Sequence, residues 1–157
     1  MAIKRLNHAV LWVRDAAASA AFYSDVLGFE IVANLGGGQA MFLRADGSNN
    51  DHDLGLFTVG PRPAAPAQSP GLYHLAWQVG TIDELVAMQA KLQAAGALVG
   101  ASDHGVSKSL YAKDIDGIEL EVMWASPRDQ WSNLALTAPL DLAAEVARFS
   151  GFDTADQ

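Results

Sequence analysis

The chain has 157 residues, 50% of them hydrophobic, and a net charge of −8 from 18 acidic and 10 basic side chains. It contains no cysteine, which excludes disulfide scaffolds, thiolate zinc sites, iron–sulfur clusters and a cysteine nucleophile. The scattered basic residues argue against nucleic acid as a partner, and no apolar run approaches the ~18 residues of a membrane span. The N-terminus lacks a signal-peptide pattern, so we expect an acidic globular protein of the cytoplasm that binds neither nucleic acid nor membranes.

Two segments of the chain resemble each other at an offset of 66 residues. Each is a short apolar run that begins with a histidine, His8 or His74, and each is followed by a helix-capping residue, Asp15 or Thr81. Thr81 also has a glutamate three residues later, which is the spacing of a capping box. Such apolar runs are typical of buried strands, and the caps predict a helix directly after each strand.

The two halves continue to correspond after these helices. Gly28 and Gly96 stand where a left-handed C-terminal cap belongs, and three more apolar runs follow each glycine. The expected strands cover about 29–34, 39–45 and 53–59 in the first half, and about 97–102, 108–113 and 118–124 in the second. The sequence therefore predicts a strand–helix–strand–strand–strand module, present twice.

The segment 61–71 holds four of the six prolines, so it is expected to be a loop that links the modules. This places modules at about 4–60 and 72–125 within one domain, 1–125, followed by a C-terminal extension, 126–157. In the extension, Thr137 and Pro139 could open a short helix that continues to Phe149. Such a helix could cover an exposed edge of its own sheet or contact a second subunit.

Three residues form a candidate metal-binding set. His8 and His74 occupy equivalent strands, so both imidazoles could face a shared cavity if the modules pair by a local two-fold axis. In the last strand, alternation places Glu119, Glu121 and Met123 on the face opposite Leu120 and its apolar neighbours. A carboxylate there is costly unless it is paired, metal-bound or exposed on the wet face of an antiparallel sheet.

Two neutral imidazoles and one carboxylate are the ligand types that bind Fe(II) on one face and leave positions open for substrate and oxygen. Mn(II) fits the same mixture of ligands, whereas zinc more often takes a tetrahedral site. This donor chemistry is the reason to consider His8, His74 and Glu121 together.

Four stretches, 6–10, 21–29, 74–77 and 114–121, resemble motifs of the vicinal oxygen chelate superfamily over about residues 4–125. This superfamily includes glyoxalase I, bleomycin-resistance proteins and type I extradiol dioxygenases. Ile115 and Ile118 replace the proline and asparagine of the family pattern but leave the glutamate in register. The resemblance implies an α+β fold in which two βαβββ modules form a curved mixed sheet around a metal cavity. It also implies that His8, His74 and Glu121 are the metal ligands.

The repeat helps to choose among members of the superfamily. Adding 66 to residue 55 gives 121, so Gly55 is the equivalent of Glu121. A site like that of glyoxalase I would carry a second glutamate at this position, and the nearest carboxylate here is Asp53. A site with three protein ligands and room for a bidentate substrate and O2 favours an oxygenase.

Two further stretches, 51–56 and 103–111, resemble the extradiol subgroup. The resemblance implies that His52 is an acid–base residue, a role suited to an imidazole near neutral pH. It implies that Tyr111, ten residues before Glu121, hydrogen-bonds the substrate oxygen, and that His104 polarises oxygen or substrate. Without the motifs, His52 would be a surface-loop residue and Tyr111 a packing residue.

The sequence thus favours an Fe(II)-dependent, or alternatively Mn(II)-dependent, extradiol dioxygenase that opens a catechol-type ring with O2. Two alternatives are a glyoxalase-like metal-dependent isomerase or lyase, and a metal-free ligand-binding protein of the bleomycin-resistance type. The family resemblance also implies a homodimer. Trp12, Phe42, Trp77 and Met123 are candidates for the walls of the pocket.

Overall fold

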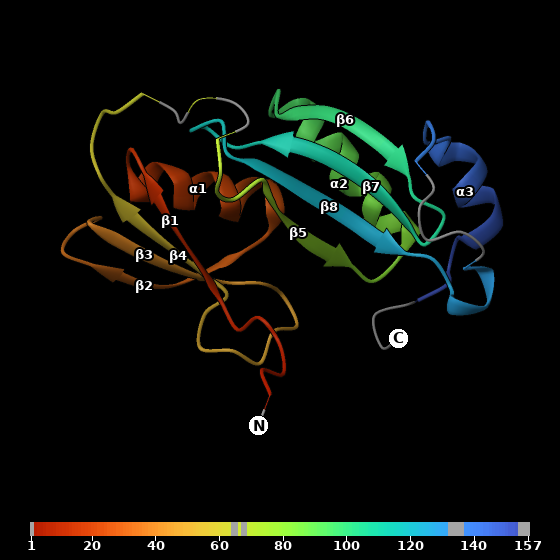
Figure 1. The fold of residues 1–157 in the computed structure, drawn as a ribbon, viewed down its shortest axis with the longest axis horizontal. Helices are drawn as coiled ribbons and strands as arrows, with labels where there is room; N and C mark the ends of the chain where they lie inside the picture. Colours follow the sequence, from red (N-terminus) through yellow and green to blue (C-terminus); the bar gives the residue numbers. More distant parts are fainter. Residues whose placement is uncertain (1, 64–65, 67–68, 132–136, 154–157) are drawn as a thin grey trace. The chain divides into compact units, whose positions relative to one another are not determined.

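The computed structural model describes residues 2–63, 66, 69–131 and 137–153, which form two compact units (Figure 1). Unit 1 covers residues 1–67 and unit 2 covers residues 68–157. The division falls within the proline-rich segment 61–71. Among the described residues, no helix has the length and apolar character needed to cross a membrane.

Unit 1 is built around a four-stranded sheet in the order β1-β4-β3-β2. Strands β1 and β4 are parallel, and the other two pairs are antiparallel. The elements are β1 (Ala9–Val13), α1 (Ala16–Leu27), β2 (Glu30–Leu35), β3 (Ala40–Arg44) and β4 (Leu54–Thr58).

Unit 2 repeats this arrangement with a sheet in the order β5-β8-β7-β6, in which β5 and β8 are parallel. The predicted α+β fold and the repeated βαβββ module are therefore confirmed. A 3-10 turn, η1, and a short helix, α3, follow the module. The elements are β5 (His74–Val79), α2 (Ile82–Ala94), β6 (Leu98–Asp103), β7 (Ser107–Lys113), β8 (Glu119–Ala125), η1 (Arg128–Gln130) and α3 (Leu142–Phe149).

The two long helices have the predicted N-terminal caps, and the predicted glycines follow their C-terminal ends. Asp15 caps α1 by accepting hydrogen bonds from two backbone N–H groups of the first turn. Thr81 and Glu84 form the complete capping box at the start of α2. Gly28 and Gly96 have φ angles of 82° and 65°, the left-handed conformation that glycine adopts without strain.

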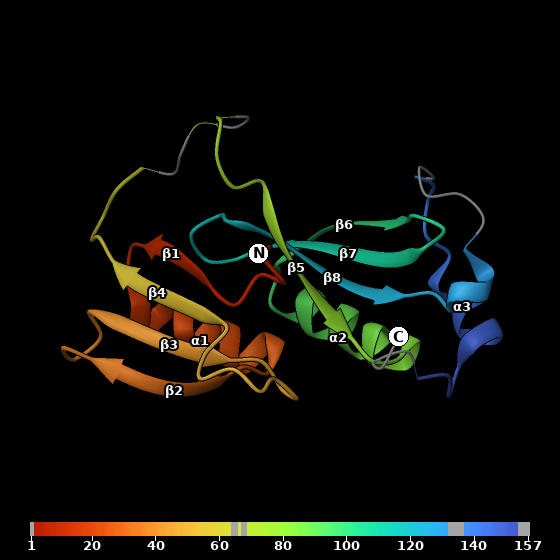
Figure 2. The same ribbon diagram turned by 60° about the horizontal axis from the view of Figure 1, so that its bottom comes forward.

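Each sheet has one face covered by a helix (Figure 2). Helix α1 packs on the first sheet and α2 on the second. In β8, alternate side chains are buried toward the helix, which confirms the predicted alternation; these are Leu120, Val122 and Trp124. We call the other face of each sheet its open face, and Glu121 lies there.

The strand register confirms the equivalence that was counted from the sequence. Val10 pairs with Gly55 in the parallel ladder of unit 1, and Ala76 pairs with Glu121 in that of unit 2. Both partners are displaced by the same 66 residues from one module to the other. Gly55 is thus the structural counterpart of Glu121.

The C-terminal extension packs on unit 2 itself. The ring of Phe149 in α3 lies 5.3 Å from the ring of Trp124, centroid to centroid. Ala138 forms a backbone bridge with Asp103 at the end of the edge strand β6. These contacts support the expectation that the extension covers its own sheet.

The start of the last helix was predicted too early. Helix α3 begins after Asp141, whose side chain caps it, rather than at Thr137 or Pro139. Ala138 is held in an extended pairing with Asp103, so this part of the chain cannot take up helical geometry. The local sequence contains two plausible start signals, and the tertiary hydrogen bonds select the later one.

Replacing Thr81 by alanine should lower the free energy of unfolding by about 1 kcal/mol, because it removes the acceptor that caps α2. The variant Thr81→Ser keeps the hydroxyl group and should remain close to the native chain. Urea denaturation followed by circular dichroism measures both. Equal stability of the alanine and serine variants would contradict this role of the cap.

Candidate active site

His74 and Glu121 meet on the open face of unit 2. His74 is the first residue of β5, and Glu121 lies in the middle of the neighbouring parallel strand β8. The Nε2 atom of His74 lies 3.0 Å from Oε2 of Glu121. The residue directly opposite Glu121 on β5 is Ala76, whose small side chain leaves room for the imidazole to reach the carboxylate.

The atoms of this pair fit a divalent metal ion. Two ligands about 2.1 Å from a metal and at right angles to each other lie about 3.0 Å apart. The Nδ1 atom of His74 is buried and finds no hydrogen-bond partner among the described residues. Oε1 of Glu119 lies 3.9 Å from that nitrogen and is the carboxylate that could orient a ligating imidazole. Without a cation, His74 and Glu121 form a hydrogen-bonded pair.

Tyr111 and His104 lie beside this pair. Tyr111 is the neighbour of Glu121 on β7, and its ring centroid is 5.9 Å from that of His74. The phenol oxygen of Tyr111 lies 2.8 Å from Nε2 of His104. Partial burial and, next, the negative charge of Glu121 raise the pKa of Tyr111, so its hydroxyl group stays protonated at neutral pH. Four of the six predicted site residues therefore gather in unit 2.

The other two predicted residues, His8 and His52, gather in unit 1. Their ring centroids are 4.6 Å apart, and the rings of Phe42 and His52 form a T-shaped pair with centroids 5.0 Å apart. Nδ1 of His8 lies 2.9 Å from the side-chain oxygen of Asn7, and Nδ1 of His52 lies 2.8 Å from a carboxylate oxygen of Asp51. In both rings these contacts use Nδ1. Nε2 is therefore the nitrogen that could bind a metal ion or exchange a proton.

The metal-ligand set itself stays a prediction. His8 belongs to unit 1, whereas His74 and Glu121 belong to unit 2. Within the part of the chain that the structure describes, no three histidine or carboxylate groups come together as a metal site.

The open face of unit 1 is apolar where that of unit 2 is polar. Phe42 pairs with Gly55 on β3 and β4, just as Tyr111 pairs with Glu121 on β7 and β8. A Cβ atom at Gly55 would point onto this face, 3.4 Å from Val10 and 3.6 Å from Phe42. The two modules thus offer an apolar pair and a polar pair at equivalent positions.

Asp53, the carboxylate nearest to Gly55 in the sequence, is hydrogen-bonded to residues of its own loop. It accepts hydrogen bonds from the backbone N–H of Ala45 and from the side chains of Ser48 and Asn50. Partial burial pushes the pKa of Asp53 upward, but these hydrogen bonds outweigh it and hold the pKa below its usual value. The carboxylate of Asp53 is therefore held within its own loop.

Of the residues expected to line the pocket, Trp77 was assigned wrongly. It pairs with Val122 on the helix-covered face of its sheet. Trp12, Phe42 and Met123 lie on open faces, and Trp12 is 70% exposed. The side chain of Trp77 is separated from the open face by the sheet itself.

Sequence reasoning missed Asn50, which connects the segments that carry the two histidines of unit 1. Its side chain is buried, and its amide nitrogen donates to the backbone carbonyl of Asn7 and to Asp53 at 2.8 and 2.6 Å. These bonds join the residue in front of His8 to the loop that holds His52. An asparagine in a polar loop gives no sequence signal of such burial, because the burial depends on a distant segment.

A family model described as "Glyoxalase/Bleomycin resistance protein/Dioxygenase superfamily" matches residues 5–122. The chain belongs to this superfamily. The predicted relationship to the vicinal oxygen chelate proteins is thereby confirmed.

Two relatives with curated names are dioxygenases. The chain is 32% identical over 130 residues to catechol-2,3-dioxygenase of Bacillus subtilis (strain 168), covering 80% of this chain and 43% of that protein. It is 33% identical over 133 residues to biphenyl-2,3-diol 1,2-dioxygenase 3 of Rhodococcus globerulus, covering 80% of this chain and 67% of that protein. The chain thus spans less than half the length of the Bacillus relative.

A solved structure supports the fold. The glyoxylase/bleomycin resistance protein/dioxygenase domain from Frankia sp. EAN1pec aligns with a TM-score of 0.66 at 23% identity. The alignment covers 81% of this chain and 96% of that domain.

Replacing Asn50 by alanine should lower the free energy of unfolding by about 1–3 kcal/mol, because it leaves buried hydrogen-bonding groups unsatisfied. It should also shift the NMR signals of the His8 and His52 rings. The adjacent, exposed Asn49 provides the matched control, and Asn49→Ala should stay within about 0.5 kcal/mol of the native chain. Equal effects of the two substitutions would rule out the connecting role of Asn50.

Proposed function

We propose that this chain is a metal-dependent extradiol dioxygenase that opens a catechol-type aromatic ring with O2. The observation that carries this proposal is Gly55 at the position equivalent to Glu121, with Asp53 held in its loop. Three protein ligands leave positions for the two adjacent oxygens of a diol and for O2. A second glutamate at position 55 would occupy one of them.

His8, His74 and Glu121 would hold the metal, Fe(II) or alternatively Mn(II). When bound, this ion would act as a Lewis acid that lowers the pKa of the substrate hydroxyls and as a path for electrons from the ring to O2. The 3.0 Å separation of the His74 and Glu121 donor atoms supports the assignment of these two ligands. His8 is included as the third ligand because it is equivalent to His74 in the repeat.

His52 would move protons. A catechol loses protons as it binds, and a proton must return when the O–O bond breaks. An imidazole suits both transfers near neutral pH. Because Asp51 engages Nδ1 of His52, the ring is oriented with Nε2 available to exchange a proton with the substrate.

Tyr111 would donate a hydrogen bond to a substrate oxygen. A tyrosine phenol is protonated at neutral pH, as a donor must be. His104 contacts the same phenol oxygen at 2.8 Å and would hold it in place.

Similarity to catechol-2,3-dioxygenase and biphenyl-2,3-diol 1,2-dioxygenase 3 supports a vicinal aromatic diol as the substrate class. A metal-free binding protein would have no use for a histidine and a carboxylate that converge on one point. An isomerase or lyase of the glyoxalase type is expected to carry the fourth ligand that this chain lacks.

The first test is metal content and ring opening, measured on protein prepared without oxygen and with iron and manganese supplied. We expect about one Fe or Mn per native chain, none in His74→Ala, and yellow ring-opened products from catechols with the native chain only. His52→Ala should keep its metal but lose about 100-fold or more of its turnover. Full metal occupancy in His74→Ala, or a folded native chain without metal, would overturn the proposal.

Gly55→Glu tests the open coordination position directly. We expect this variant to bind metal at least as tightly as the native chain and to lose ring opening, because the new carboxylate takes a place needed by substrate or O2. Gly55→Ala is the control, since its Cβ atom makes ordinary contacts with Val10 and Phe42. Ring opening by Gly55→Glu at the native rate would show that position 55 does not face the metal.

A further inference from the structure

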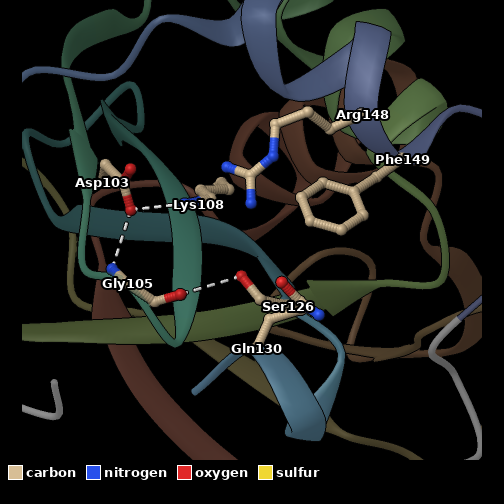
Figure 3. A pocket seen from close by; sticks show the side chains of 7 residues that line it. All are labelled: Asp103, Gly105, Lys108, Ser126, Gln130, Arg148 and Phe149. Atoms are coloured by element: carbon tan, nitrogen blue, oxygen red, sulfur yellow. Dashed lines mark hydrogen bonds and ion pairs between the residues drawn. The ribbon is translucent and has the colours of Figure 1, made fainter. Parts of the chain in front are cut away.

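The C-terminal extension holds the backbone next to His104 in place. Asp103 and Ala138 exchange two backbone hydrogen bonds, of 2.8 and 2.9 Å. The carboxylate of Asp103 also accepts from Lys108 Nζ at 2.6 Å and from the backbone N–H of Gly105 at 2.7 Å (Figure 3). The residues on both sides of His104 are therefore fixed.

A buried ion cluster ties α3 to the same place. The side chain of Lys108 is only 5% exposed, and its Nζ atom also lies 3.5 Å from Oε2 of Glu145 in α3. Asp103 and Lys108 line a small cavity of about 180 Å³ together with Arg148 and Phe149 of α3 (Figure 3). A buried cation is stable only with its partners present, so these contacts keep the extension on its own sheet.

Thr137 directly precedes Ala138 and contacts the imidazole of His104. Its hydroxyl oxygen lies 3.3 Å from Nδ1 of His104, while Nε2 of the same ring lies 2.8 Å from the hydroxyl oxygen of Tyr111. The imidazole thus bridges the extension and the tyrosine on the open face. Because a neutral imidazole has one donor and one acceptor nitrogen, the ring must donate to one of these two oxygens and accept a hydrogen bond from the other.

The direction of these bonds decides what the tyrosine can do. A phenol has a single proton, so Tyr111 can donate to a substrate only if it accepts a hydrogen bond from His104. That requires the proton of the imidazole to be on Nε2. Nδ1 must then accept, and the Thr137 hydroxyl is placed to donate to it.

We propose that the C-terminal extension is a positioning element of the active site: Thr137 holds His104 protonated at Nε2, so that the phenol proton of Tyr111 is directed to the substrate. This inference rests on the proposed function for the role of Tyr111 in turnover. The hydrogen-bond chain itself, from Thr137 through His104 to Tyr111, does not depend on it.

The test compares Thr137→Val, which removes the hydroxyl at nearly constant volume, with Thr137→Ser, which keeps it. Two-bond ¹H–¹⁵N NMR of the histidine rings at about pH 8.5, where a free imidazole is neutral, reports which nitrogen is protonated. The signal of His104 is assigned by its loss in His104→Gln. We expect the Nε2-protonated form in the native chain and in Thr137→Ser, and a mixture of both forms in Thr137→Val.

Turnover provides the second readout. If the chain opens catechols, Thr137→Val should lower kcat about tenfold with little change in metal content, and Thr137→Ser should restore it. An unchanged His104 tautomer in Thr137→Val, or a serine variant that behaves like the valine variant, would overturn the positioning role. A tautomer change together with no ring opening by the native chain would support the positioning role and overturn the proposed reaction.

Discussion

The parallel pairing of the first and last strand in each module is the constraint on which the candidate site depends. A parallel pair needs a long crossover, and here the crossover is a helix and two further strands. This arrangement brings His74, at the start of its module, to within 3.0 Å of Glu121, near its end. The antiparallel strand that follows in the sheet then sets Tyr111 beside the same carboxylate. Residues far apart in the sequence become neighbours through the strand register, together with the small side chain of Ala76 opposite Glu121.

The two modules share one backbone arrangement but carry different side chains at equivalent positions. At equivalent positions the second module has a glutamate and a tyrosine, and the first has Gly55 and Phe42. The first module adds its own polar groups just outside the strands, at His8 and His52. Because the helix-covered faces supply the buried core, the open faces can differ without disturbing the fold.

Much of the fold could be predicted because its signals are local. The capping residues Asp15 and Thr81, the apolar runs and the offset of 66 residues were enough to place strands, helices and the equivalence of Gly55 to Glu121. Features that depend on distant contacts could not be predicted. The burial of Asn50 depends on the segment before β1, and the late start of α3 depends on the pairing of Ala138 with β6. The register shifts in the pairing of β2 with β3 and of β6 with β7 also leave no mark in composition or periodicity.

A common orientation of the histidines connects the candidate site with its surroundings. In three of the four histidine rings, Nδ1 contacts a neighbouring side chain, and Nε2 is the nitrogen available for metal binding or hydrogen bonding at the site. In the fourth ring, that of His74, Nε2 contacts Glu121. A hydrogen bond at one nitrogen fixes the ring plane of an imidazole, and a partner atom that can only accept also fixes its tautomer; metal binding and proton transfer depend on both. The neighbours are Asn7 for His8, Asp51 for His52 and Thr137 for His104. Two of these neighbours adjoin their histidine in sequence, whereas Thr137 comes from the extension, which makes the tail part of the same orienting scheme.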